Sequence, residues 1–269
     1  MRLWDAEGAS LDQAVLAFTV GDDPVLDREL LPFDCVASAA HARMLHEIGM
    51  LRSEELESVL GALAAARRMA LADRFEIALE QEDGHTALEL FLVDRVGEAG
   101  RKIHTGRSRN DQVIAALRLL IRERLLLLGE QIQDIALLLL DRSEEERETP
   151  LPGYTHTRQA MPSTVGQLLS SVAEGLAADL ELFLGPLALA HRSALGSASG
   201  YGVPLPLRRE RAAEMLGLER ADINTLYVQN TRGRLESATL AGLHQASLTR
   251  ATFGSDVSST TSSTSRQNA

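Results

Sequence analysis

The densest polar segment of the sequence is HTGRSRNDQ at residues 104–112, where a long helix is predicted to begin. Ser108 or Asn110 can cap that helix, because a short polar side chain can accept from its free N–H groups. Arg107 and Arg109 flank a helix start whose dipole already favours anions. Guanidinium groups bind carboxylates through paired hydrogen bonds, so the segment predicts a carboxylate-binding site. The alternative is an ordinary capped helix start with solvated arginines.

A second polar segment, PGYTHT at residues 152–157, lies in the break between two long predicted helices. A histidine in a loop shaped by proline and glycine is better placed for proton transfer than one on an apolar helix face. His156 is therefore a candidate general acid or base. A purely structural histidine is the alternative.

A third polar segment is EDGHT at residues 82–86. Its acidic pair could orient His85, or Asp83 could cap the helix that follows. His41 and His46 are five residues apart, which suits metal coordination poorly, and we interpret both as non-catalytic. The sequence contains neither a glycine-rich phosphate loop nor a GxSxG nucleophile elbow.

Helices must position these segments, because helical periodicity dominates the sequence and aromatic residues make up only 4% of it. Over residues 111–148, apolar residues recur every three or four positions without a proline, which predicts one long helix. A second long helix is predicted over 163–191, with a kink at Pro186. Helices of this length bury wide apolar stripes only in a bundle, so we predict an all-α fold that other subunits complete. Shorter helices are predicted over residues 53–72, 208–216 and 235–252.

Composition and charge exclude several classes of protein. The 269-residue chain is 45% hydrophobic and 24% charged, which is typical of a globular protein. Its net charge of −11 argues against nucleic acid or an anionic membrane as a partner. The most apolar window, 125–140, is too short to span a membrane, and we expect no signal peptide because residues 1–10 lack a basic start followed by an apolar run. The single Cys35 permits no internal disulfide, so we predict a cytoplasmic protein.

Three regions are predicted along the chain. An N-terminal helical domain covers residues 1–105, and a central helical bundle domain covers 106–253. From residue 254 onward, nine of sixteen residues are serine or threonine, without periodicity. This composition predicts a disordered, low-complexity tail over 254–269.

Five sequence blocks, in this order, resemble those of argininosuccinate lyases, which belong to the fumarase/aspartase superfamily. The resemblance covers about residues 15–250. The HTGRSRND and PGYTH blocks favour this branch over fumarase, aspartase or adenylosuccinate lyase. The five blocks are FTVGDDPVLDRELLPFD (18–34), EDGHTALE (82–89), KIHTGRSRNDQV (102–113), PGYTHTRQAMPSTVGQ (152–167) and GSASGYGVPLPLRRE (196–210).

The resemblance implies a homotetramer with a fumarase/aspartase-like long-helix bundle, in which segments of several subunits form each active site. These enzymes cleave argininosuccinate to arginine and fumarate by β-elimination, with no cofactor and no metal. The reaction removes a proton beside a carboxylate, and the resulting dianion needs dense positive charge and hydrogen bonds. The arginine-rich helix start contains groups of that kind.

The family's site residues are assigned to positions of this sequence by matching motifs. His156 is expected to be the catalytic general acid or base, or the partner that orients it. Arg109 and Asn110 are expected to hold carboxylate and polar groups of the substrate. Thr155 is expected to form a hydrogen bond with the substrate, and Asp27 matches an aspartate of the family's N-terminal substrate segment.

Some positions depart from the family pattern. Asp23 stands where many members carry a substrate-binding serine, and Arg232 aligns loosely with an arginine of the third motif region. The sequence also lacks the family's GSSxMPQKxN loop, whose serine is the proposed base. We therefore expect a bundle that is incomplete at the C-terminus, and little or no lyase activity from this chain alone. The alternatives are a non-catalytic structural helical oligomer and a sister lyase such as adenylosuccinate lyase.

Overall fold

The computed structural model describes residues 13–156 and 158–266 and divides the chain into two compact units. The first unit is formed by residues up to 122 together with 189–232. The second is formed by residues 123–188 together with those from 233 onward. Each unit therefore combines segments that are distant in the sequence, which differs from the predicted division at residues 105 and 106.

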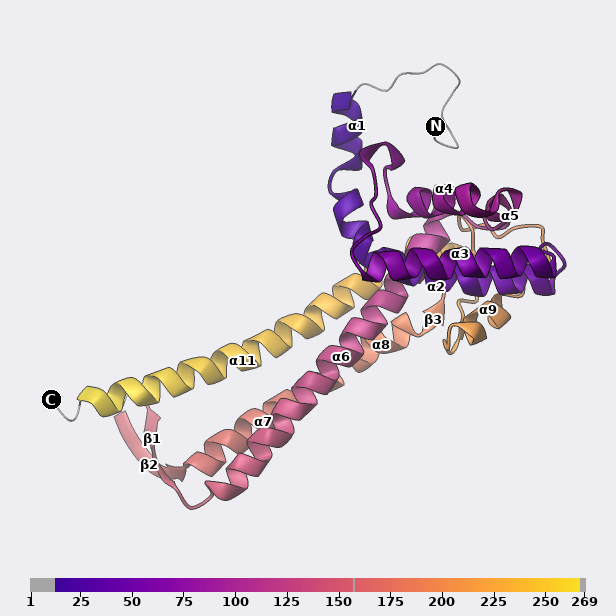
Figure 1. The fold of residues 1–269 in the computed structure, drawn as a ribbon. Helices are drawn as coiled ribbons and strands as arrows, with labels where there is room; N and C mark the ends of the chain where they lie inside the picture. The colour runs from indigo at the N-terminus through magenta and orange to yellow at the C-terminus, as the bar shows by residue number, and fades with distance from the viewer. Residues whose placement is uncertain (1–12, 157, 267–269) are drawn as a thin grey trace. The chain divides into compact units, whose positions relative to one another are not determined.

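The core of the first unit lies among α2, α3 and α4, where α2 packs along α3 and α4 lies against both (Figure 1). Leu31, Met44, Leu45, Leu63 and Leu92 are all fully buried there. This apolar core holds the start of α4 in a fixed place. The elements of the unit are α1 (Gln13–Val20), α2 (Asp23–Glu47), α3 (Ser53–Leu71), η1 (Leu79–Gln81), α4 (Gly84–Val96), α5 (Glu98–Lys102), β3 (Arg192–Ser193), α9 (Arg209–Met215), β4 (Arg220–Ala221) and α10 (Thr225–Asn230).

Helix α6 (Arg109–Glu145) confirms the predicted long helix. It is uninterrupted because it contains no proline, and its single glycine, Gly129, weakens a helix without ending it. In the second unit, several of its leucines form an exposed apolar face that the chain itself does not cover. These residues are Leu126, Leu127, Leu137, Leu138 and Leu140.

The break after α6 forms a β-hairpin, whereas the sequence predicted a loop. Strands β1 (Pro150–Thr155) and β2 (Arg158–Thr164) pair antiparallel, with an irregular register next to Gly153. Both strands are edges of a two-stranded ribbon, so prolines are tolerated where no N–H is needed. The hairpin does not change the class of the fold, which is predominantly helical, as predicted.

The second predicted long helix is divided in two. Helix α7 (Val165–Glu181) begins after Thr164, whose hydroxyl accepts from the N–H of Gln167. Helix α8 (Leu184–Ala190) follows, so the break precedes Pro186. A proline in the first turn of a helix needs no N–H donor, which explains why it lies at the start of α8.

Helix α11 (Arg234–Arg266) packs against α7 within the second unit. It extends beyond the predicted 235–252 and into residues 254–266, where the composition predicted a disordered tail. Serine and threonine are weaker helix formers than alanine by only a fraction of a kcal/mol, and a helix already begun gains one hydrogen bond for each residue added. Low complexity alone therefore does not end this helix.

Replacing Gly153 with alanine should destabilise the hairpin, because the added Cβ would lie 2.6 Å from the carbonyl oxygen of Met161. Relieving that overlap should cost about 1–3 kcal/mol. Hydrogen exchange of the amides of residues 150–164 should become faster in this variant. Gly61→Ala is the matched control, since no atom lies within 4 Å of a Cβ built there. Equal exchange in the hairpin of both variants would contradict the close approach.

Candidate functional site

The start of α6 is capped by Ser108, and Asp111 ties it to a distant loop over residues 196–203, the glycine-rich loop. The Ser108 hydroxyl accepts from the N–H of Asn110 at 3.3 Å, and Asp111 Oδ1 accepts from the N–H of Ser108 at 2.9 Å. Asp111 Oδ2 accepts from the N–H groups of Gly196 at 3.0 Å and Ala198 at 2.9 Å. Burial raises the pKa of Asp111, although these hydrogen bonds oppose the shift. Of the two predicted caps, the structure uses Ser108.

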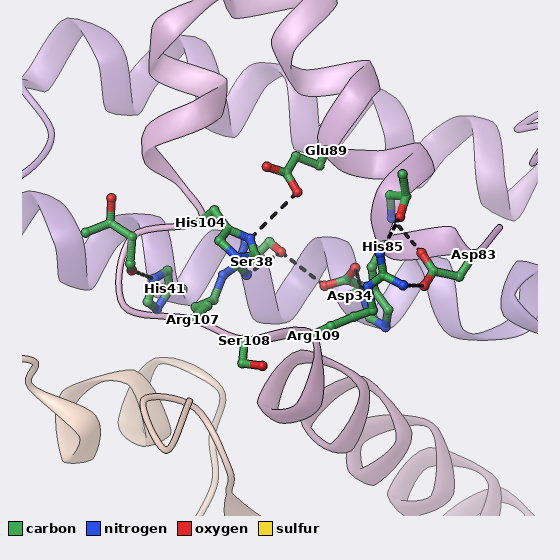
Figure 2. Close-up of polar contacts among 12 residues, drawn as sticks. Asp34, Ser38, His41, Asp83, His85, Glu89, His104, Arg107, Ser108 and Arg109 are labelled. Atoms are coloured by element: carbon green, nitrogen blue, oxygen red, sulfur yellow. Dashed lines mark hydrogen bonds and ion pairs between the residues drawn. The ribbon is translucent and has the colours of Figure 1, made fainter. Parts of the chain in front are cut away.

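A buried polar chain runs from Arg107 through α2 to α4 (Figure 2). Arg107 is 8% exposed, and its Nη1 donates to the hydroxyl of Ser38 at 2.9 Å. Ser38 in turn donates to Asp34 Oδ1 at 3.1 Å. Asp34 Oδ2 lies 2.6 Å from Nδ1 of His85, in the first turn of α4. The chain of contacts therefore fixes the arginine just before α6.

Asp34 and His85 form a buried pair in which the pKa of each is shifted toward its charged form. Burial by itself would raise the pKa of Asp34, but the charge and hydrogen bond of His85 lower it below its usual value. Burial likewise opposes a charged His85, yet Asp34 raises the pKa of His85 above its usual value. Burial lowers the pKa of Arg107, but from so high a value that the guanidinium stays charged. The negative charge of Asp34 therefore favours the charged forms of both His85 and Arg107.

Arg109 is anchored to the start of α4. Its Nη1 lies 2.8 Å from Asp83 Oδ2, and its Nη2 donates to the hydroxyl of Thr86 at 3.1 Å. Asp83 Oδ1 also accepts from the N–H of Thr86 at 2.8 Å and so caps α4. The helix-cap interpretation of this segment is therefore confirmed. The hydrogen-bonded partner of His85 is Asp34, from the helix that α4 packs on, and not the neighbouring acidic pair.

Asp27 contacts the same helix start. Its Oδ2 accepts from the N–H of Gly84 at 2.8 Å. A Cβ at Gly84 would lie 3.1 Å from the Cβ of Asp27, so this close approach favours glycine. Burial raises the pKa of Asp27, while the bond from Gly84 opposes the shift. Asp27 and Arg109 thus both lie at the beginning of α4.

A hollow of about 630 Å³ opens between the start of α6 and the glycine-rich loop. Burial lowers the pKa of His104, whose Nδ1 lies 3.7 Å from Glu89 Oε2, so the imidazole is neutral at neutral pH. The guanidinium groups of Arg107 and Arg109 therefore dominate the charge of the hollow, and its volume suits a small anion. Among the described residues, no cluster of histidine, cysteine and acidic side chains could hold a metal. The lining residues are Glu82, His104, Arg107, Ser108, Arg109, Ala198, Ser199, Gly202 and Val203.

The sequence profile of the family described as Lyase matches residues 13–263 of this chain. The chain belongs to this lyase family. It is 42% identical over 246 residues to the argininosuccinate lyase of Stenotrophomonas maltophilia, covering 91% of this chain and 57% of that protein. It is 43% identical over 245 residues to that of Sorangium cellulosum, covering the same shares. It is 38% identical over 256 residues to that of Thermotoga neapolitana, covering 95% of this chain and 64% of that protein. The chain thus spans less than two thirds of the length of these relatives.

Two solved structures of EDDS lyase are similar to the chain, each with a TM-score of 0.71 and 25% identity. One is a variant with bound fumarate and covers 98% of this chain; the other is a complex with formate and covers 97%. In each case 50% of the solved chain is matched. This similarity confirms the predicted fumarase/aspartase-like fold class. Both solved lyases hold a small carboxylate.

Three of the predicted site residues lie in the first unit. Asp27 and Arg109 contact the start of α4, as described above. Asn110 follows Arg109, and its Oδ1 accepts from Nη1 of Arg232 at 3.1 Å. Asp23 is the first residue of α2 and is exposed. The first unit therefore brings together groups from α2, from the starts of α4 and α6, and from Arg232, which are four segments far apart in the sequence.

Thr155 and His156 lie in the second unit, at the turn of the hairpin. Thr155 is the last residue of β1 and is paired with Arg158. His156 follows it with a φ of 51°, a left-handed conformation that is uncommon for residues other than glycine. Both residues are exposed. The tight turn presents the imidazole at the surface of this unit.

The sequence analysis missed Asp34 and Ser38. Together with His41 they recur at helical spacing on the buried side of α2, and all three are 0–1% exposed. His41 Nε2 lies 2.9 Å from the carbonyl oxygen of Thr105, and burial lowers the pKa of His41, so it is neutral. Polar residues recurring on an otherwise apolar helix face are the signal that could have located this network.

Proposed function

We propose that the protein is an argininosuccinate lyase and that the hollow at the start of α6 binds a carboxylate of the succinyl group. The observation that supports this most strongly is the pair of arginines, Arg107 and Arg109, lining a hollow of about 630 Å³. The similarity of the chain to known argininosuccinate lyases indicates which carboxylate-bearing substrate to expect. The reaction would yield arginine and fumarate.

The elimination removes a proton from the carbon beside a carboxylate and breaks the bond from the neighbouring carbon to nitrogen. The electron pair left behind forms the double bond of fumarate, and the departing nitrogen takes up a proton. Before the bond breaks, the carboxylate carries a second negative charge, so cations near it stabilise this intermediate more than the substrate. Arg107 suits that role because its contacts with Ser38 and Asp34 hold it in place before substrate arrives.

The other residues have distinct proposed roles. Arg109 and Asn110 hold the substrate's carboxylate and polar groups, and Asp27 orients the start of α4 beside them. Thr155 hydrogen-bonds the substrate. His156 acts as general acid or base, or orients that group, because an imidazole can accept and donate protons near neutral pH. No metal or cofactor is needed for these steps.

We further propose a homotetramer whose active sites combine segments of several subunits. The exposed leucines of α6 support this, because a contiguous apolar helix face on a single chain usually marks an interface. Light scattering should then give a mass four times that of the 29.2-kDa chain. A cytoplasmic location is supported by the single buried Cys35, which permits no internal disulfide.

Replacing Arg109 with glutamine should weaken the binding of argininosuccinate about ten- to a hundredfold, because a charge-assisted pair of hydrogen bonds is lost. Calorimetric titration of the wild-type and variant chains measures this. Arg109→Lys should lose less, since it keeps the charge but not the planar fork. Arg101→Gln is the control, because Arg101 is exposed, pairs with Glu98 at 2.9 Å and does not line the hollow.

The rivals give different results in the same titration. Tighter binding of adenylosuccinate than of argininosuccinate would favour a sister lyase and contradict the proposed substrate. A stable oligomer that binds neither compound would favour a structural role. Release of fumarate, followed by its ultraviolet absorbance, tests the elimination itself. Because the sequence lacks the GSSxMPQKxN loop, little or no release is expected from this chain alone, and release at a rate typical of the family would contradict that expectation.

A further inference from the structure

A second hollow, of about 520 Å³, lies in the first unit beside β3, β4 and α10. It shares no lining residue with the hollow at the start of α6. Nothing in the proposed elimination uses it. Its lining residues are Arg192, Arg220, Asp222, Ile223, Asn224, Leu226, Tyr227 and Asn230.

Two arginines are forced side by side on one wall of this second hollow. Strands β3 and β4 pair in parallel, with Arg192 directly opposite Arg220. Residues opposite one another on neighbouring strands project from the same face, with backbones about 5 Å apart. Like charges at such positions are unfavourable unless an anion lies between them. Both side chains line the hollow, so an anion there would contact both.

The nearby carboxylates do not neutralise this pair. Asp222 is 2% exposed, and its Oδ2 lies 2.6 Å from Nη1 of Arg118, a third arginine. Glu219 reaches Arg220 only at 3.9 Å, from a side chain that is 58% exposed. Nε of Arg192 is buried, and among the described residues it has no hydrogen-bond partner. The wall therefore has an excess of positive charge, in a chain whose net charge is −11.

The rest of the lining is partly apolar. Ile223 is 84% exposed and Leu226 is 41% exposed, and Tyr227 lies beside them on α10. Asn224 uses its side-chain oxygen to cap α10, accepting from the N–H groups of Leu226 and Tyr227. Its amide NH₂ is therefore the group it can offer to a ligand. A ligand that matches this lining has one anionic head and an apolar body.

We propose that this second hollow binds a small organic carboxylate, with its carboxylate between Arg192 and Arg220 and its apolar body against Ile223 and Leu226. Two guanidinium groups can share the four lone-pair positions of one carboxylate, which offsets their mutual repulsion. The site is independent of the elimination, because none of its residues lines the first hollow. Binding there would pin β3, β4 and α10 to one another.

Titration with hexanoate tests this site, with 1-hexanol as the uncharged probe and sulfate as the anion without an apolar body. The Arg192 Nε–H resonance and the amide of Tyr227 should shift saturably with hexanoate in ¹⁵N-correlated spectra. Arg192→Gln and Arg220→Gln should each raise the Kd at least about tenfold. Arg192→Lys should give an intermediate Kd, which separates lost charge from lost geometry. Circular dichroism would verify that each variant is folded.

Two controls separate this site from the first hollow. Arg101→Gln removes one positive charge from an exposed pair elsewhere and should leave the Kd unchanged. Arg109→Gln should weaken argininosuccinate binding while leaving the hexanoate shifts intact. Hexanoate binding that is lost in Arg109→Gln would place the ligand in the first hollow and overturn the proposal.

The other outcomes also decide the question. Equal shifts with hexanol would show an apolar patch without anion recognition. Equal affinity for sulfate would show that charge alone matters. Shifts of the Arg192 resonance that depend on protein concentration without ligand would show that a second copy of the chain occupies the hollow. Each of these results, like the absence of any shift, contradicts the proposed site.

Discussion

Replacing Asp34 with asparagine should lower the free energy of unfolding by about 3–5 kcal/mol. The variant keeps the shape of the side chain but removes the charge that balances His85 and Arg107. His85 loses a partner at 2.6 Å, and Arg107 loses the carboxylate that Ser38 connects to it. Because all of these groups are buried, water cannot replace the lost interaction.

Urea unfolding followed by circular dichroism measures the effect of Asp34→Asn. Asp94→Asn is the control, since Asp94 lies exposed on α4 and should change stability by no more than about 0.5 kcal/mol. The double variant Asp34→Asn/His85→Gln should recover part of the loss, because the unpaired imidazolium is gone. If Asp34→Asn costs no more than the control, the ion pair is not formed as described.

The same pair makes stability depend on pH in a definite direction. The pKa of Asp34 is lowered from 3.8, so its contribution is present above that value and is lost as the pH falls through the folded pKa. The pKa of His85 is raised from 6.5, so its contribution is present below 6.5 and is lost as the pH rises through the folded pKa. Stability from the pair should therefore be greatest between about pH 4 and 6.5. In Asp34→Asn the free energy of unfolding should fall less steeply at both the acidic and the basic end of this range. Unfolding measured from pH 3 to 9 would show this.

Periodicity predicted the helices because a helix is a local structure. Helix α6 follows directly from apolar residues at three- and four-residue spacing over a segment without proline. The hairpin was missed because its pairing joins residues up to fourteen positions apart, such as Pro150 and Thr164, and its prolines and glycine indicate a break instead. The two units could not be predicted, since each joins segments from different parts of the chain.

The candidate site shows the same limit. Arg107, Ser108 and Arg109 stand out in one segment, and they do line a common hollow. The partner of His85 was sought among its neighbours, Glu82 and Asp83, but is Asp34, 51 residues away. Only the packing of α4 on α2 brings these two together. Motif spacing therefore located the groups that line the hollow, and could not locate the groups that fix them in place.

Replacing Asp222 with asparagine should also destabilise the first unit by about 3–5 kcal/mol. Asp222 Oδ2 lies 2.6 Å from Nη1 of Arg118, and the two side chains are only 3% and 9% exposed. The same Nη1 donates to the carbonyl oxygen of Arg192 at 3.0 Å, so the pair joins α6 to β3 and to the residue after β4. Asp141→Asn, an exposed change on α6, is the control.

The double variant Arg118→Met/Asp222→Leu distinguishes two roles for this pair. Replacing both partners by apolar side chains leaves no buried charge, so stability should return close to that of the wild type. The carbonyl of Arg192 would still lose its donor, and the register of β3 beside β4 would loosen. Hexanoate binding at the second hollow should therefore stay weak even though urea unfolding is normal. Recovery of both properties would show that the pair contributes only to stability, and loss of both would show that the apolar replacement does not pack.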